Sequence, residues 1–133
     1  MKHVLKVKIY YEDTDCGGVV YYANYLKYFE RARTEFLESR GVSLKKLMQE
    51  GTYFVVAEAS LKYVLPGRYA DILLIETEVE KVGPASIIFR HEVLREETGE
   101  KIVNATVKLG CVGQNGKPIR LTHEIMDAMA ERA

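Results

Sequence analysis

One short acidic segment, Asp13-Thr14-Asp15-Cys16-Gly17-Gly18, holds the residues best suited to chemistry in this chain. It follows a predicted strand and precedes a predicted long helix, and its residue types favour a tight turn with positive φ. A carboxylate just ahead of a helix lies beside backbone N–H groups that have no partner within the helix. Asp15 would then serve as general base for water or as nucleophile, while the N–H of Tyr22 or Ala23 polarises a substrate carbonyl.

A structural role is the alternative for the same aspartate. Asp15 can accept hydrogen bonds from the turn backbone in an Asx-turn, and the residue types alone favour this interpretation because Asp before Gly is common in turns. Asp13 has the same two interpretations and favours the structural one more strongly.

Other reactive groups give weaker signals. Cys16 would need a histidine as base, but none of His3, His91 and His123 lies in a catalytic-cysteine signature. His91 is expected to be packed or paired across strands, and His123 to be solvated. Two aspartates with one stray histidine are too few ligands for a metal, so no metal site and no cofactor are expected. Nucleotide-binding glycine motifs do not occur.

The helix after the turn carries charged flanks and many tyrosines. Glu30–Arg33 and Arg31–Glu35 have the spacing of surface ion pairs, although a buried polar network or a second catalytic carboxylate is the alternative. Most of the tyrosines are expected in the core or at an interface, with Tyr22 as the exception because it lies at the candidate site.

Hydrophobic periodicity predicts the elements that position this segment. Leu5, Val7, Ile9 and Tyr11 share one face of a first strand, and a later strand carries Val55, Ala57, Ala59, Leu61 and Tyr63 on one face. We expect helices at 23–40, 44–50 and 123–130, and strands at 5–11, 53–65, 72–81, 86–96 and 101–112. Consecutive strands with short connections and one long helix indicate an α+β fold with an antiparallel sheet of about five strands.

Composition restricts the functional class. The 133 residues are expected to form one domain, 1–133, and 19 basic residues balance 19 acidic ones, so neither nucleic acid nor a membrane is an expected partner. No apolar run is long enough to span a bilayer, and two distant cysteines suit a cytoplasmic protein. One helix cannot cover such a sheet, which predicts a homodimer or homotetramer.

Three stretches carry a family resemblance: YYEDTDCGGVVYYANYLKYFERARTEFL, LKYVLPGRYADILLIET, and the strand pair ending at Cys111. They resemble hotdog-fold acyl-CoA thioesterases of the 4-hydroxybenzoyl-CoA thioesterase family, in particular the YbgC-like, Tol-Pal-associated branch. In this fold a long antiparallel sheet wraps around one long central helix. The resemblance implies that Asp15 is the catalytic carboxylate, that the Tyr22 N–H polarises the thioester carbonyl, and that Gly18 and Val19 contact substrate.

The resemblance also implies an acyl-CoA whose nucleotide lies on basic residues near the surface. Lys62, Arg68, Arg90 and Arg95 are candidates for the CoA phosphates, and Arg68 is the best of them because it lies in the Pro-Gly-Arg turn. The chain departs from its YbgC-like relatives at Tyr22, where they carry His, which argues against a mechanism that uses an imidazole there.

These observations favour an acyl-CoA thioesterase, which converts an acyl-CoA to free acid and CoA. The competing class is a non-catalytic hotdog protein that binds an acyl thioester or serves as a scaffold. A dehydratase on the same fold is a third possibility, and Tyr22 argues against it because that chemistry uses a histidine.

Overall fold

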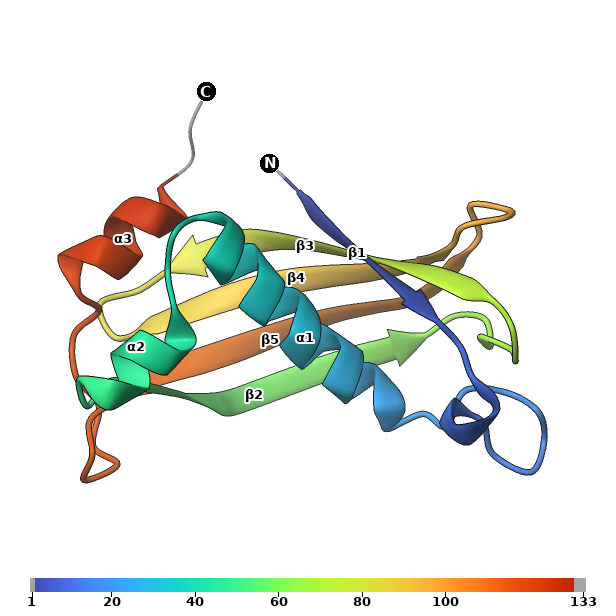
Figure 1. Ribbon diagram of the computed structural model, residues 1–133, viewed down its shortest axis with the longest axis horizontal. Coiled ribbons are helices and arrows are strands. Elements are labelled where there is room, and N and C mark those ends of the chain that lie inside the picture. The colour runs from blue at the N-terminus through green and yellow to red at the C-terminus, as the bar shows by residue number, and fades with distance from the viewer. Residues whose placement is uncertain (1, 131–133) are drawn as a thin grey trace.

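The computed structural model describes residues 2–130, which form five strands and three α-helices joined by short connections (Figure 1). The N-terminal part contains strand β1 (His3–Lys8), a 3₁₀ turn η1 (Tyr11–Asp13), the long helix α1 (Asn24–Ser39) and the short helix α2 (Leu44–Gln49). The rest contains β2 (Tyr53–Tyr63), β3 (Ile72–Val82), β4 (Ser86–Arg95), β5 (Lys101–Val112) and α3 (His123–Met129). The predicted ends of these elements are within a few residues of the observed ones.

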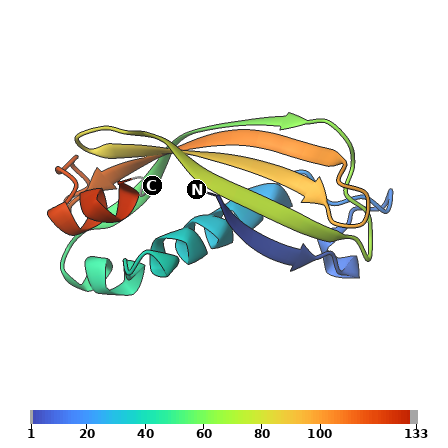
Figure 2. The ribbon, with the colours of Figure 1, turned by 90° about the horizontal axis from the view of Figure 1, so that it is seen from above.

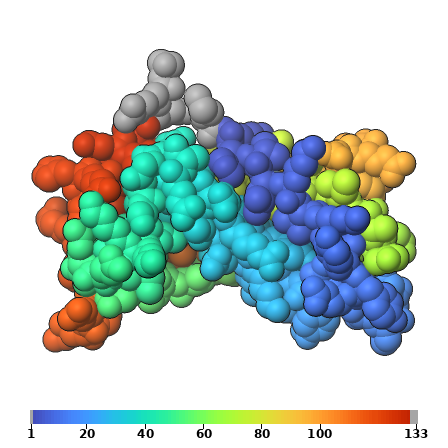
Figure 3. All heavy atoms as spheres, in the orientation of Figure 1, coloured from blue at the N-terminus to red at the C-terminus, as the bar shows by residue number. Residues whose placement is uncertain are grey.

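All five strands form one antiparallel sheet in the order β1-β3-β4-β5-β2. The sheet curves over α1, which lies along its concave side (Figure 2). From the helical side, α1 crosses the middle of the molecule between β1 and α2 (Figure 3). The predicted α+β architecture is confirmed.

Two buried clusters fill the space between α1 and the sheet. The first surrounds the N-terminal half of α1, including Tyr25, Tyr28 and Phe29, and packs against β1, β3, β4 and β5. The second surrounds Phe36 and Leu37 and includes residues of α2 and α3. The alternation of buried and partly exposed residues along β4 and β5 follows the period of two expected for strands with one core face. The start of α1 is therefore fixed by packing close to the candidate site.

The predicted buried faces of two strands, β1 and β2, are partly wrong. Strand β1 ends at Lys8, and Tyr11 is 80% exposed in the 3₁₀ turn instead of continuing the buried face. In β2, Val56 pairs with Leu109 but Glu58 pairs with the next residue, Lys108, so Ala57 forms a bulge. A bulge shifts the alternation by one residue, which puts Val55 on the face opposite to Leu61.

The single-domain prediction of 1–133 includes Met1 and residues 131–133, which lie outside the described residues, and it stays a prediction. Within residues 2–130, none of the helices combines the length and the apolarity needed to cross a membrane.

Candidate active site

Asp13 organises the connection between β1 and α1. Its Oδ2 accepts a hydrogen bond from the backbone N–H of Tyr10 at 2.8 Å, and its Oδ1 accepts one from the Tyr28 hydroxyl at 2.9 Å. Its carbonyl oxygen accepts from the Tyr21 N–H and from the Asn24 amide, each at 2.9 Å. Burial, followed by the bond to the Asp13 carboxylate, raises the pKa of Tyr28. Asp13 therefore has the structural role that its position favours.

Asp15 lies two residues later on an exposed turn. Its Oδ1 accepts from the Gly17 N–H at 2.8 Å, which is the Asx-turn expected as the structural alternative. Its backbone closes a small loop, since the Asp15 N–H donates to the Val19 carbonyl at 2.9 Å and the Gly18 N–H donates to the Asp15 carbonyl at 3.1 Å. Gly18 has φ of +79°, a conformation that residues with a Cβ rarely adopt. Within residues 2–130, Oδ2 of Asp15 has no hydrogen-bond partner, so one carboxylate oxygen is held and the other is free.

The backbone N–H of Tyr22 is an unused donor at the start of α1. The helix begins at Asn24, with Ala23 as its N-cap in a helical conformation. The Tyr21 and Asn24 N–H groups find backbone acceptors, whereas that of Tyr22 has none within the described part of the chain. The Tyr22 carbonyl accepts a bond from the Tyr63 hydroxyl at 3.0 Å, which fixes this end of the helix to β2. The helix dipole adds partial positive charge here.

An apolar groove of about 300 Å³ has Tyr22 among its lining residues. Its walls are aromatic and aliphatic and come from the segment that leads into α1, from the first turn of α1, and from the end of β2 with the residues after it: Val20, Tyr22, Tyr25, Tyr63, Val64, Leu65 and Pro66. The rings of Tyr22 and Tyr25 both contact Tyr63, with centroid separations of 6.3 and 5.9 Å. The groove suits an uncharged acyl group.

The turn between β2 and β3 supports the Asp15 loop. The Val20 N–H donates to the Gly67 carbonyl at 2.8 Å, and Val19 forms a β-bridge with Arg68. A Cβ on Gly67 would lie 2.9 Å from the Tyr25 hydroxyl, so only glycine allows this close approach. The structure thus brings Gly18, Val19 and Arg68 together around Asp15. Arg68 is exposed and forms no ion pair within residues 2–130.

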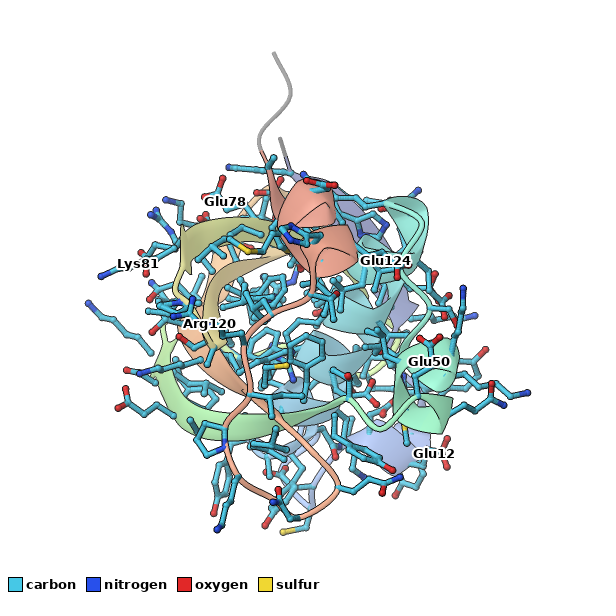
Figure 4. All side chains as sticks on the ribbon, turned by 90° about the vertical axis from the view of Figure 1, so that its left-hand side faces the viewer. Glu12, Glu50, Glu78, Lys81, Arg120 and Glu124 are labelled. Atoms are coloured by element: carbon cyan, nitrogen blue, oxygen red, sulfur yellow. The ribbon has the colours of Figure 1, made fainter. Side chains whose placement is uncertain are left out.

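The other predicted CoA-binding cations lie elsewhere. Lys62 and Arg90 line a polar hollow on the outer face of the sheet, opposite to α1, where Arg90 is 4.0 Å from Glu78. Figure 4 shows Glu78 and Lys81 on this outer side and Glu12 and Glu50 on the helical side. Arg95 is occupied by protein groups, as described below, so its assignment as a phosphate ligand has no support in this geometry.

A buried polar pair was missed by the sequence analysis. Arg33 was expected in a surface ion pair, but it is only 6% exposed and its Nη1 lies 3.2 Å from Nε2 of His91. Burial, followed by the charge of Arg33, lowers the pKa of His91 to about 3. His91 is packed and paired across strands as predicted, with Nδ1 2.9 Å from the Thr77 hydroxyl. Arg33 lies four residues after Phe29, on the buried face of α1, and this helical spacing was the sequence signal that Arg33 could be buried.

Comparison with known proteins adds to this geometry. Residues 17–102 match the model of the thioesterase superfamily. The chain belongs to this family. It is 40% identical over 124 residues to an acyl-CoA thioesterase YbgC of Haemophilus influenzae, covering 92% of this chain and 90% of the relative.

Solved structures agree with this assignment. A DHNA-CoA thioesterase from Staphylococcus aureus superposes with a TM-score of 0.86 at 27% identity, over 90% of this chain and 80% of that one. The structure of a 4-hydroxybenzoyl-CoA thioesterase with 4-hydroxybenzoyl-CoA bound shares the fold, with a TM-score of 0.89 at 19% identity over 97% of this chain and 99% of that chain. The predicted family, the hotdog fold and the class of thioester hydrolase are confirmed.

Proposed function

We propose that this thioesterase hydrolyses acyl-CoA thioesters, with Asp15 as the catalytic carboxylate and the Tyr22 N–H as the oxyanion donor. The observation that carries this proposal is the unused Tyr22 N–H at the helix start, beside the loop that holds Asp15. The names of the curated relatives supply the substrate class.

The division of contacts around Asp15 suits catalysis. Oδ1 is held by the Gly17 N–H, which fixes the orientation of the carboxylate, and Oδ2 has no partner within the described residues. With the acyl group in the tyrosine-lined groove, the thioester carbonyl would accept from Tyr22 N–H as negative charge develops on its oxygen. Asp15 then either takes a proton from a water molecule that adds to the carbonyl carbon, or attacks that carbon itself to form a mixed anhydride that water hydrolyses in a second step. In both routes the C–S bond breaks, the acid is released, and the CoA thiolate takes up the proton that water gives up.

Arg68 is the proposed contact for the CoA phosphates, because it is the one cation among the candidates next to the Asp15 loop through its bridge to Val19. Lys62 and Arg90 remain candidates only for parts of the nucleotide that extend to the outer face of the sheet.

A homodimer is part of this proposal. Strand β2 is at the edge of the sheet, and Val55, Val56, Tyr63, Val64 and Leu65 on it and after it are between 39 and 56% exposed. A second copy on this edge would cover apolar surface next to the groove. Light scattering at micromolar concentration tests this: we expect twice the monomer mass or a multiple of it, and a monomer would contradict it. We also propose a cytoplasmic location, where free thiols such as Cys16 and Cys111 are maintained.

Replacing Asp15 by asparagine tests the catalytic role. The amide oxygen of the new side chain can still accept the Gly17 N–H bond, so the turn and the thermal midpoint should be preserved while the charge is lost. We expect a decrease of about 10²-fold or more in thiol release from short-chain and aromatic acyl-CoAs, the range typical of removing a general base. The matched control is Glu12→Gln, an exposed carboxylate in the same connection.

Three outcomes separate the alternatives. Near wild-type turnover of Asp15→Asn would remove this residue from the mechanism. Wild-type protein that binds CoA but releases no thiol from any acyl-CoA would instead favour a non-catalytic binding protein. Equal losses in Asp15→Asn and Glu12→Gln would point to general damage to the connection.

A further inference from the structure

Arg95, at the end of β4, uses two of its guanidinium nitrogens to hold the 66–71 turn and the third to bind Glu100, in the connection between β4 and β5. Its Nε donates to Asp71 Oδ2 at 3.0 Å, its Nη2 donates to the Pro66 carbonyl at 2.7 Å, and its Nη1 donates to Glu100 Oε1 at 2.6 Å. The side chain of Arg95 is only 13% exposed, and that of Asp71 is 18% exposed. An arginine with all three nitrogens occupied by protein groups is not available to a ligand phosphate.

Asp71 connects this arginine to the backbone of the turn. The same Oδ2 that receives the Arg95 bond also accepts the Arg68 N–H at 2.9 Å, and the Asp71 N–H donates to the Arg68 carbonyl at 3.1 Å. Between them, Ala70 has φ of +71°, which costs conformational free energy in a residue with a Cβ. Backbone bonds to Ile9 also hold this turn, since the Ala70 N–H donates to the Ile9 carbonyl at 3.0 Å and the Ile9 N–H donates to the Asp71 carbonyl at 2.8 Å. The Asp71 and Arg95 side chains add contacts that support the strained conformation of the 66–71 turn.

The 66–71 turn carries the contacts that place the catalytic loop. Gly67 accepts the Val20 N–H at 2.8 Å and donates its own N–H to the Tyr25 hydroxyl at 3.2 Å. Val19 forms its bridge with Arg68, and the Val19 carbonyl accepts the Asp15 N–H. In Figure 1 the β2–β3 connection lies at the same end of the sheet as η1 and the start of α1. A shift of the turn thus moves Val19 and Val20, which lie in the chain between Asp15 and Tyr22.

We infer that Arg95 and Asp71 are positioning residues for the thioester hydrolysis: through the 66–71 turn they set the position of Asp15 relative to the Tyr22 N–H. This inference depends on the function proposed above. Neither residue touches the reacting atoms, so their loss lowers the rate of the chemical step and leaves substrate binding nearly unchanged. Catalytic rate is sensitive to small displacements, because a misplacement of about 1 Å can reduce it about 10²-fold.

The experiment separates kcat from KM in four variants, measured at 25 °C after thermal melts have verified that each is folded. Arg95→Met removes all three bonds, and we expect kcat to decrease about 10–100-fold, with KM changed less than about threefold. Arg95→Lys keeps the charge but has a single donor group instead of a planar fork, so it should recover only part of kcat. Glu100→Gln, which removes a charge outside the 66–71 turn, is the matched control and should have nearly wild-type kcat. Arg68→Ala should mainly raise KM.

If Arg95→Met does not fold, Asp71→Ala decides the question, because it removes the one oxygen that accepts both the Arg95 Nε–H and the Arg68 N–H. Folded Arg95→Met or Asp71→Ala with wild-type kcat would overturn the inference, and so would a large rise in KM at constant kcat, which would make Arg95 a ligand-binding group. Asp15→Asn is assayed in parallel. Activity of that variant would refute the proposed catalytic carboxylate, whereas an inactive Asp15→Asn beside a fully active Arg95→Met would refute only the positioning role.

Discussion

Acidification should destabilise this protein through His91, a histidine that is completely buried against Phe29 and Phe89. Arg33 has only donors, so Nε2 of His91 must accept from it, and the ring proton lies on Nδ1 and is donated to Thr77. Protonating Nε2 would remove the bond to Arg33 and place two positive charges side by side in the core. Burial and this charge are why the pKa of His91 falls to about 3.

The direction of the effect follows from proton uptake in the two states. In the unfolded chain His91 takes up a proton as the pH falls through its ordinary pKa of 6.5, whereas the native state stays neutral until the pH approaches 3. The unfolded state then binds more protons, so the contribution of His91 to stability is complete above pH 6.5 and is lost as the pH falls toward 3. Between pH 7 and pH 5 the loss from this one residue is about 2 kcal/mol, a large share of a typical total stability of about 5–15 kcal/mol.

Urea unfolding at pH 7 and pH 5 measures this loss, followed by circular dichroism or by the fluorescence of the nine tyrosines, since the chain has no tryptophan. The variant His91→Gln has no titrating ring, so its decrease in unfolding free energy between the two pH values should be smaller than that of wild type by about 2 kcal/mol. Comparing the change with pH cancels any constant cost of the substitution. Exposed His123→Gln is the matched control. Equal pH dependence of wild type and His91→Gln, at one protein concentration, would refute the reasoning.

Two further substitutions test the architecture of the site. Gly67→Ala places a methyl group 2.9 Å from the Tyr25 hydroxyl. We expect the unfolding free energy, measured in a thermal or urea melt, to fall by about 1–3 kcal/mol and turnover to decrease. Wild-type stability would show that Gly67 and Tyr25 are not tightly packed. Asp13→Asn puts an amide N–H₂ group in place of one acceptor oxygen, facing either the Tyr10 N–H or the Tyr28 hydroxyl. We expect this substitution to cost about 1–3 kcal/mol of unfolding free energy and Asp15→Asn to cost almost none. The reverse order of the two losses would exchange the roles of the two aspartates.

Much of the fold could be predicted from the sequence because local patterns agree with tertiary packing. The alternation along β4 and β5 matches their buried faces, and Ser43 and Thr122 cap α2 and α3 through bonds to the N–H groups of Lys46 and Ile125. Alternation and capping depend on neighbouring residues alone, so a single sequence contains them.

The errors come from interactions between distant segments. The bulge at Ala57 depends on how β2 pairs with β5, and no residue type in β2 marks it. Arg33 has a charge that indicates a surface position, but its partner His91 lies 58 residues away on β4. Arg95 was predicted as a phosphate ligand on charge alone, although Asp71, Glu100 and Pro66 already occupy it. In each case the sequence provides the group and the tertiary structure determines its partner.

The two aspartates in the connection between β1 and α1 differ in how many hydrogen bonds they form with the protein. Asp13 uses both carboxylate oxygens and its carbonyl oxygen to bind the chain on either side, so neither carboxylate oxygen can move toward a substrate without loosening the helix start. Among residues 2–130, the Asp15 carboxylate is bound through one oxygen only, to the Gly17 N–H. A general base or nucleophile needs a fixed orientation together with a free oxygen, and Asp15 has both. Asp13 holds the helix start, where the Tyr22 N–H has no acceptor in the described part of the chain, and Arg95 with Asp71 supports the turn that contacts the Asp15 loop. In the proposed mechanism, the same carboxylate group thus serves as a support at position 13 and as the reactive group at position 15, because the number of bonds to each side chain differs.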